Sequence, residues 1–107
     1  MWETSANGGC LANLAVVELR YTGPFRKALA KLGAQERKRI EAATTMVAKA
    51  WGDPHRHSGI SIRNIRPGIY EARCGLRLRL LFIHDHDELV FFLFGAHDAV
   101  QKWIRNF

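Results

Sequence analysis

Arginines are concentrated in one segment of the chain, where they far outnumber acidic residues. Six arginines stand between His55 and Arg79, at positions 56, 63, 66, 73, 77 and 79, against a single acid, Glu71. A guanidinium group presents a planar fork of N–H donors that suits phosphate oxygens through paired, charge-assisted hydrogen bonds. Any one of these arginines is equally well explained as the solvent-facing side of a sheet. Together they predict a surface that binds a phosphodiester backbone.

A histidine beyond this segment adds a group that can move protons. His97 follows the last apolar run of the chain, and imidazole titrates close to neutral pH, so it is a candidate general acid or base. On position alone, a surface histidine that bonds Asp98 or the backbone at a helix start is the simpler interpretation.

Four further histidines form two H-x-H pairs, His55 with His57 and His84 with His86. Neutral imidazole is the commonest transition-metal ligand, so these pairs raise a metal site as an alternative. However, the segment around His84 lies where one predicted strand must turn into the next, and short polar residues are expected there without any function. We therefore expect no metal and no other cofactor.

The composition indicates one small domain with a polyanionic or acidic partner. With 107 residues and 48% hydrophobic content, the chain is long enough to bury a core without metals or disulfides. Its formal net charge of +6 favours nucleic acid or an acidic protein as partner. We predict a soluble cytoplasmic protein for three reasons. The chain has only two cysteines, Cys10 and Cys74, its N-terminal run lacks the basic start of a secretion signal, and no apolar run is long enough to span a membrane.

The elements that position these groups begin after a flexible leader, predicted over residues 1–13, and the domain is predicted over 14–107. A strand over 15–21 leads into a helix that starts at Pro24, and Gly33 is expected to cap the end of this helix. A second helix is predicted over 35–51, because apolar residues recur there at helical spacing on one face, at Ile40, Ala43, Val47 and Trp51.

Strands dominate the second half of the chain. Two are predicted over 60–66 and 69–74, joined by the turn dipeptide Pro67-Gly68. From Leu76 to Phe82, leucines alternate with Arg77 and Arg79, which predicts a strand with one packed face and one solvent-facing face.

The last two elements are a strand and a helix. The continuous apolar run over 89–94 is typical of a central strand covered on both faces. Asp98 is expected to cap a final helix in which Val100, Trp103 and Ile104 share one face. The predicted class is α+β, with a strand, a two-helix hairpin, an antiparallel meander of three to four strands and a short C-terminal helix.

Several of these segments together resemble the RelE/ParE superfamily of toxins from bacterial toxin–antitoxin pairs, and its HigB-like branch in particular. In that family a YE-x-R strand is followed by a glycine turn and an R-x-x-[YF] strand. The matching segments are Ile69-Tyr70-Glu71-Ala72-Arg73, then Gly75, then Arg79-Leu80-Leu81-Phe82, and finally Gly95-Ala96-His97-Asp98. The resemblance extends from the first strand to the terminal helix. It implies a RelE-like fold, ribosome-dependent cleavage of mRNA, and a cognate antitoxin.

The resemblance also implies roles for particular residues. In this reaction the ribose 2′-hydroxyl attacks the adjacent phosphate without a metal, so the protein supplies positive charge and moves protons. Arg73 and Arg79 are expected to clamp the phosphate of the transition state, and His97 to act as general acid or base. Where some relatives carry lysines, this chain has arginines, which clamp phosphate but are poor proton shuttles.

Other residues are expected to act around that centre. Glu71 is expected to orient Arg73 through an ion pair, because the two residues lie on one face of a strand. Trp103 fits an aromatic that stacks on RNA, although packing in the core explains it equally well. The residues expected to bind RNA are Arg63, Arg66, Arg77 and Trp103.

Two alternative functions stay open at this stage. A ParE-like protein would inhibit DNA gyrase without nuclease activity, but such members generally lack a catalytic histidine or tyrosine near the last strand, so His97 favours RNA cleavage. A non-catalytic nucleic-acid-binding module would need only the basic face. For the toxin, the expected partners are mRNA, the ribosome and a cognate antitoxin, with a DNA-binding region in that antitoxin as one option.

Overall fold

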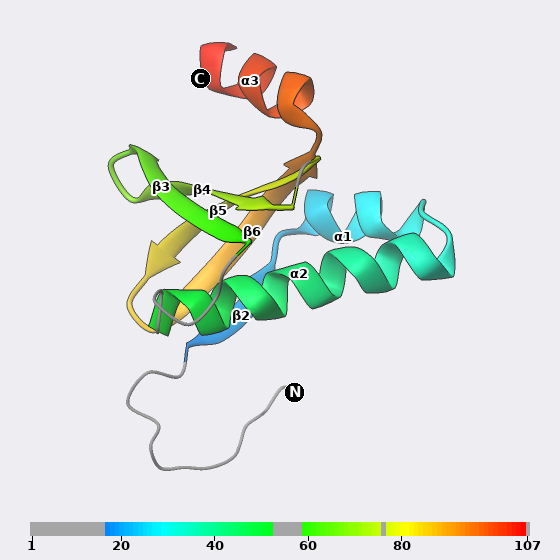
Figure 1. The fold of residues 1–107 in the computed structure, drawn as a ribbon, viewed down its shortest axis with the longest axis horizontal. Helices are drawn as coiled ribbons and strands as arrows, with labels where there is room; N and C mark the ends of the chain where they lie inside the picture. The colour runs from blue at the N-terminus through cyan, green and yellow to red at the C-terminus, as the bar shows by residue number, and fades with distance from the viewer. Residues whose placement is uncertain (1–16, 53–58, 76, 107) are drawn as a thin grey trace.

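The computed structural model describes residues 17–52, 59–75 and 77–106 (Figure 1). The predicted leader over 1–13 therefore lies outside the described residues, as does the His55-x-His57 pair. The elements are β2 (Glu18–Tyr21), α1 (Gly23–Ala30), α2 (Ala34–Gly52), β3 (Ile60–Arg66), β4 (Ile69–Cys74), β5 (Leu78–Asp85), β6 (Glu88–Gly95) and α3 (His97–Asn106). This is the α+β arrangement that the sequence predicts.

The strands form one five-stranded sheet in the order β2-β6-β5-β4-β3. Strands β3 to β6 are an antiparallel meander, whereas β2 pairs with β6 in parallel. The β3–β4 turn is Pro67-Gly68, in which Gly68 has φ +76, a conformation that glycine adopts without steric cost. Because β6 lies between β2 and β5, the apolar run over 89–94 is confirmed as an inner strand.

Helices α1 and α2 pack on one face of the sheet, which we call the helix face (Figure 1). The side chain of Thr22 accepts a hydrogen bond from the Phe25 amide at 3.3 Å and caps α1. Gly33 does not cap the end of α1 as predicted. Its carbonyl instead accepts the Arg37 amide at 2.9 Å, in the first turn of α2. The core between helices and sheet includes Phe25, Leu29, Ile40, Val47, Ala72, Leu80, Phe82, Leu89 and Phe91.

Helix α3 packs against β5 and β6 and covers part of the opposite face of the sheet. Val100 is fully buried, and the ring of Trp103 lies 5.1 Å from that of Phe92. The helix begins at His97, so Asp98 lies inside its first turn and is not the cap that the sequence predicts. The guanidinium of Arg66 donates to the Ile104 carbonyl at 3.3 Å, near the carboxyl end of α3, where a cation is favourable.

Strand β5 differs from the prediction of one packed face and one wet face. Leu80, Leu81 and Phe82 are all fully buried, because α1 and α2 cover one face and α3 covers the other. The pairing of β5 with β6 also shifts between Leu81 and Phe82, so that Leu81 faces Leu93 while Phe82 faces Phe91. The extra residue of this irregularity is Phe92 in β6, so the alternation of β5 itself is intact, and Leu81 is buried on the face opposite to Leu80 and Phe82.

The described part of the chain contains no helix that is both long enough and apolar enough to span a bilayer.

Candidate functional site

The strand register gathers the predicted arginines of β3, β4 and β5 on one face of the sheet, which we call the arginine face. Across the sheet, Arg63 of β3 pairs with Glu71 of β4, and Arg73 of β4 pairs with Arg79 of β5. Residues 71 and 73 point to the same side of β4 because side chains alternate along a strand. The arginine face is defined here by Arg63, Glu71, Arg73 and Arg79.

Glu71 is the buried centre of this group. Its side chain is 0% exposed, and its Oε1 accepts a hydrogen bond from Arg63 Nε at 3.0 Å. Its Oε2 lies 3.5 Å from Nη1 of Arg79, whose side chain is 12% exposed. A buried carboxylate is costly unless it is paired, so these two guanidinium groups compensate its charge. The predicted partner of Glu71 was Arg73, but the ion pairs that form are those with Arg63 and Arg79.

The contact between Glu71 and Arg79 leaves hydrogen-bonding capacity unused. Glu71 Oε2 and Arg79 Nη1 are buried atoms without a hydrogen-bond partner in the described structure, although they form an ion pair with each other. Buried polar groups are normally satisfied, and exceptions often mark places where a ligand or solvent completes the site. Arg79 is thus placed against Glu71 by an ion pair without a hydrogen bond between these two atoms.

Arg73 stands beside Arg79 as an exposed cation. Two like charges placed directly opposite on neighbouring strands destabilise a sheet, by an amount on the order of 0.2–1 kcal/mol for such pairs. Within the described part of the chain, Arg73 has no acidic partner. An anion bound between the two guanidinium groups would remove this repulsion, so the pair is suited to a phosphate group.

His97 follows the end of the strand that pairs with Arg79. Arg79 pairs with Gly95 at the end of β6, and His97 is the first residue of α3, two positions later. Gly95 leaves this position without a side chain, and a Cβ placed there would come within 3.3 Å of the Ala99 Cβ. His97 is exposed, so its imidazole is accessible from solvent.

The other predicted RNA-binding residues lie elsewhere or have structural contacts. Arg66 is partly buried and donates to the carbonyl oxygens of Ile65 and Ile104, which ties β3 to α3. Trp103 packs on Phe92, so the packing interpretation of this residue is supported. Arg77 precedes β5 in the β4–β5 turn and lines a groove beside α2, on the helix face and away from the other arginines.

His84 and His86, the H-x-H pair within the described residues, do not form a metal site. The ring of His84 packs 4.7 Å from that of Trp51, and the exposed His86 lies 3.7 Å from an Asp85 oxygen. Over 17–52, 59–75 and 77–106, no three His, Cys, Asp or Glu side chains come together as a possible metal site.

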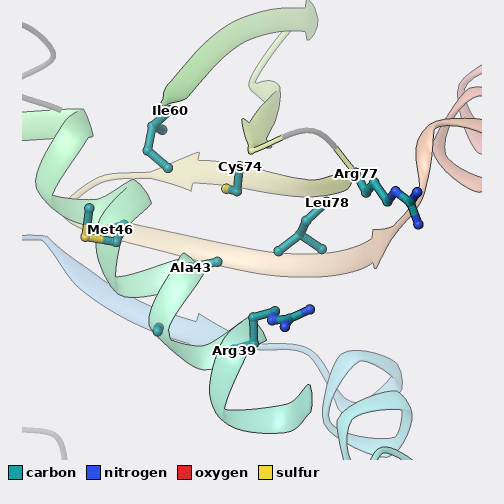
Figure 2. Close-up of a pocket in the computed structure, with 8 residues that line it drawn as sticks. Arg39, Ala43, Met46, Ile60, Cys74, Arg77 and Leu78 are labelled. Atoms are coloured by element: carbon teal, nitrogen blue, oxygen red, sulfur yellow. The ribbon is translucent and has the colours of Figure 1, made fainter. Parts of the chain in front are cut away.

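A groove beside α2 was not predicted from the sequence. An open groove of about 500 Å³ lies between α2 and the edge of the sheet (Figure 2). It brings Arg39 of α2 to the same groove as Arg77, together with the half-buried Cys74. Burial raises the pKa of the Cys74 thiol to about 11, so this cysteine is not an activated nucleophile. Helical periodicity places Arg39 on the solvent side of α2, but no sequence signal pairs it with Arg77.

Comparison with known proteins supports the RelE-like fold. No family model and no curated protein sequence matches the chain. Among solved structures, the RelB–RelE antitoxin–toxin complex from Methanococcus jannaschii matches with a TM-score of 0.52 and 16% identity, over 78% of this chain and 96% of the matched chain. The toxin–antitoxin complex RelBE2 from Mycobacterium tuberculosis matches with a TM-score of 0.49 and 27% identity, over 77% of this chain and 99% of that one. The chain has the RelE-like fold that its sequence motifs predict.

Proposed function

We propose that this protein is the toxin of a toxin–antitoxin pair and that it cleaves mRNA on the ribosome. The observation that carries the proposal is the pair of guanidinium groups on the arginine face, Arg73 exposed and Arg79 in an ion pair with the buried Glu71. The exposed His97 comes two residues after Gly95, the strand partner of Arg79. The RelE-like fold supports this assignment, because a matching solved structure is a chain of an antitoxin–toxin complex.

The proposed reaction is an intramolecular transesterification at a phosphodiester of the RNA strand. The 2′-hydroxyl oxygen attacks the adjacent phosphorus and gives up its proton, the bond from phosphorus to the 5′-oxygen of the next nucleotide breaks, and that oxygen takes up a proton. The products are a 2′,3′-cyclic phosphate and a free 5′-hydroxyl. Negative charge grows on the phosphate oxygens in the transition state, and donors fixed before the reaction stabilise it without reorganising.

Arg73 and Arg79 are suited to different parts of this task. Arg79 is nearly buried and anchored, so its guanidinium is preorganised, as stabilisation of a developing charge requires. Arg73 is exposed and can approach an RNA backbone from solvent. Arg63 is 58% exposed and shares Glu71 with Arg79, so its proposed role is to contact a neighbouring phosphate.

His97 is the proposed proton-transfer group. Arginine keeps its proton at neutral pH, so neither guanidinium can serve as a general base. Imidazole titrates in the range where both the acid and the base form are available. We assign His97 to one of the two proton transfers, at the 2′-hydroxyl or at the leaving 5′-oxygen.

A cell can tolerate this activity only if a partner restrains it. The proposed partner is a cognate antitoxin, and the cationic surface of the toxin favours an acidic chain. The proposed substrate is mRNA held by the ribosome.

An induced-expression experiment tests this function. Pulse labelling after induction is expected to show that protein synthesis stops first, with transcripts cut inside codons on ribosomes. Arg73→Ala and His97→Ala are expected to abolish toxicity while the proteins remain folded by circular dichroism. Arg26→Ala, at an exposed position on α1, is the matched control and is expected to remain toxic. If DNA replication stops while translation continues, the protein is a gyrase inhibitor and the proposal is wrong.

A further inference from the structure

The groove beside α2 lies on the opposite face of the sheet from the proposed RNA site. Cys74 and Leu78, which line it, alternate along their strands with Arg73 and Arg79, and they pack toward the helix-face core. Its walls come from α2 on one side and from the ends of the sheet strands on the other (Figure 2). The lining residues are Arg39, Ala42, Ala43, Met46, Ile60, Cys74, Arg77 and Leu78.

The groove has an apolar end and a cationic end. In Figure 2, Met46 and Ile60 lie at one end, and the guanidinium groups of Arg39 and Arg77 lie at the other, one from each wall. Met46 is 39% exposed, which is high for a large apolar side chain beside a core. Among the described residues that line the groove, none is acidic.

The two arginines of the groove retain the capacity to pair with an acid from outside. Arg39 approaches Glu36 at 3.8 Å, but both side chains are largely exposed, at 75% and 59%, and such surface pairs contribute little. For Arg77, no ion pair is found within the part of the chain that the structure describes. Both arginines therefore give this end of the groove a positive charge that an acidic partner would complement.

The chemistry of the lining excludes several kinds of occupant. Single-stranded RNA binds through stacked aromatic side chains and a track of cations, whereas the described residues that line this groove include no aromatic residue and two cations. A small molecule is usually enclosed over most of its surface, whereas this groove is open. An apolar floor with a charged end is the arrangement that receives an amphipathic helix.

We propose that this groove docks a short amphipathic helix of a protein partner, with apolar side chains toward Met46 and Ile60 and an acidic side chain between Arg39 and Arg77. Arg39 and Met46 are seven residues apart on α2, so the groove runs along about 10 Å, or two helical turns, of that helix. An occupant of two to three turns is therefore sufficient. Because the groove faces away from Arg73 and Arg79, the docked helix leaves the arginine face uncovered.

The test uses two fluorescent 12-residue peptides with the same apolar stripe, one with glutamates and one with lysines at the flanking positions. Binding to the full-length chain is measured by fluorescence anisotropy. The acidic peptide is expected to bind saturably and at least about tenfold more tightly than the basic one, a difference of roughly 1.4 kcal/mol. Arg39→Glu is expected to reverse this preference, and Met46→Asp to weaken binding of both peptides.

Controls separate this docking site from the nuclease function and from other occupants. Lys27→Glu, an exposed charge reversal on α1, is expected to bind like the parent protein, and Met46→Asp is expected to cleave RNA normally. The proposal is wrong if the two peptides bind equally, or if neither binds at concentrations up to about 1 mM. It is also wrong if the protein forms a dimer that Met46→Asp dissociates, because a second copy would then fill the groove. If the unsubstituted protein does not cleave RNA, the proposed function is wrong, but the docking proposal is not affected.

Discussion

Replacement of Glu71 by glutamine tests whether the buried carboxylate organises the arginine face. Glutamine keeps the volume of the side chain and one oxygen acceptor for Arg63 Nε, but it removes the negative charge that faces Arg79. Arg79 then remains nearly buried without a counter-charge, and its guanidinium is expected to move toward solvent. We expect a less stable fold and a weaker phosphate clamp from the same substitution.

The expected loss of free energy of unfolding follows from how exposed each arginine partner of Glu71 is. Removing one partner from a buried ion pair costs about 3–5 kcal/mol. Arg63 is 58% exposed, so the screened contact with it contributes less than about 1 kcal/mol. The retained amide oxygen and the unchanged volume reduce the loss further. We expect Glu71→Gln to lower the free energy of unfolding by about 2 kcal/mol, which corresponds to a fall in Tm of roughly 10 °C for a domain of this size.

Urea denaturation followed by tryptophan fluorescence measures this change, and a double-mutant cycle assigns it to a partner. The coupling energy between Glu71→Gln and Arg79→Gln is expected to be at least about 1 kcal/mol. The coupling between Glu71→Gln and Arg73→Gln is expected to be under about 0.5 kcal/mol, because Arg73 is exposed. A larger coupling with Arg73 than with Arg79, or a Glu71→Gln protein as stable as the parent, would refute the reasoning.

Three further variants test other parts of the account. Thr22→Ala removes the side-chain cap of α1 and is expected to cost about 1 kcal/mol in urea denaturation, whereas an unchanged midpoint would mean that the cap does not form. Burial raises the pKa of the Cys74 thiol to about 11 from an ordinary value of 9.0, so its contribution to stability is present below pH 9 and lost as pH rises toward 11. In a Cys10→Ser background, maleimide labelling of the folded protein at pH 8 should therefore be much slower than labelling of the urea-unfolded chain, and equal rates would contradict this. Arg73→Ala should unfold within about 0.5 kcal/mol of the parent, because Arg73 is exposed, yet cleave RNA roughly 10²–10³-fold more slowly.

Local signals predicted most of the elements. Strands β3 and β4 and the Pro67-Gly68 turn have the predicted bounds, because β-branched residues and a glycine with positive φ act within a few residues. Gly33 was assigned to the wrong helix end, because the same glycine lies between two helices and either could use it. The position of β2 beside β6 depends on contacts between residues about 70 positions apart.

The candidate site was predicted less completely, because tertiary contacts decide which arginines meet. The alternation of arginine and leucine predicted that Arg73 and Arg79 share a face, and the register confirms their pairing. The same alternation wrongly included Arg77, which lies in the turn before β5 and reaches the groove beside α2. The burial of Glu71 was also not predicted, since an acidic residue in a strand is normally exposed and only its two arginine neighbours make burial tolerable.

The most direct test of the proposed reaction is a transcript that lacks one 2′-hydroxyl. The protein is added to ribosomes paused on a defined codon, and the fragment ends of the mRNA are analysed. Cleavage is expected to leave a 2′,3′-cyclic phosphate and a 5′-hydroxyl, and a single 2′-deoxy nucleotide at the cleaved position should leave the transcript intact. Cleavage of the 2′-deoxy transcript, or fragments that carry a 5′-phosphate, would contradict attack by the 2′-hydroxyl and with it the roles assigned to Arg73, Arg79 and His97.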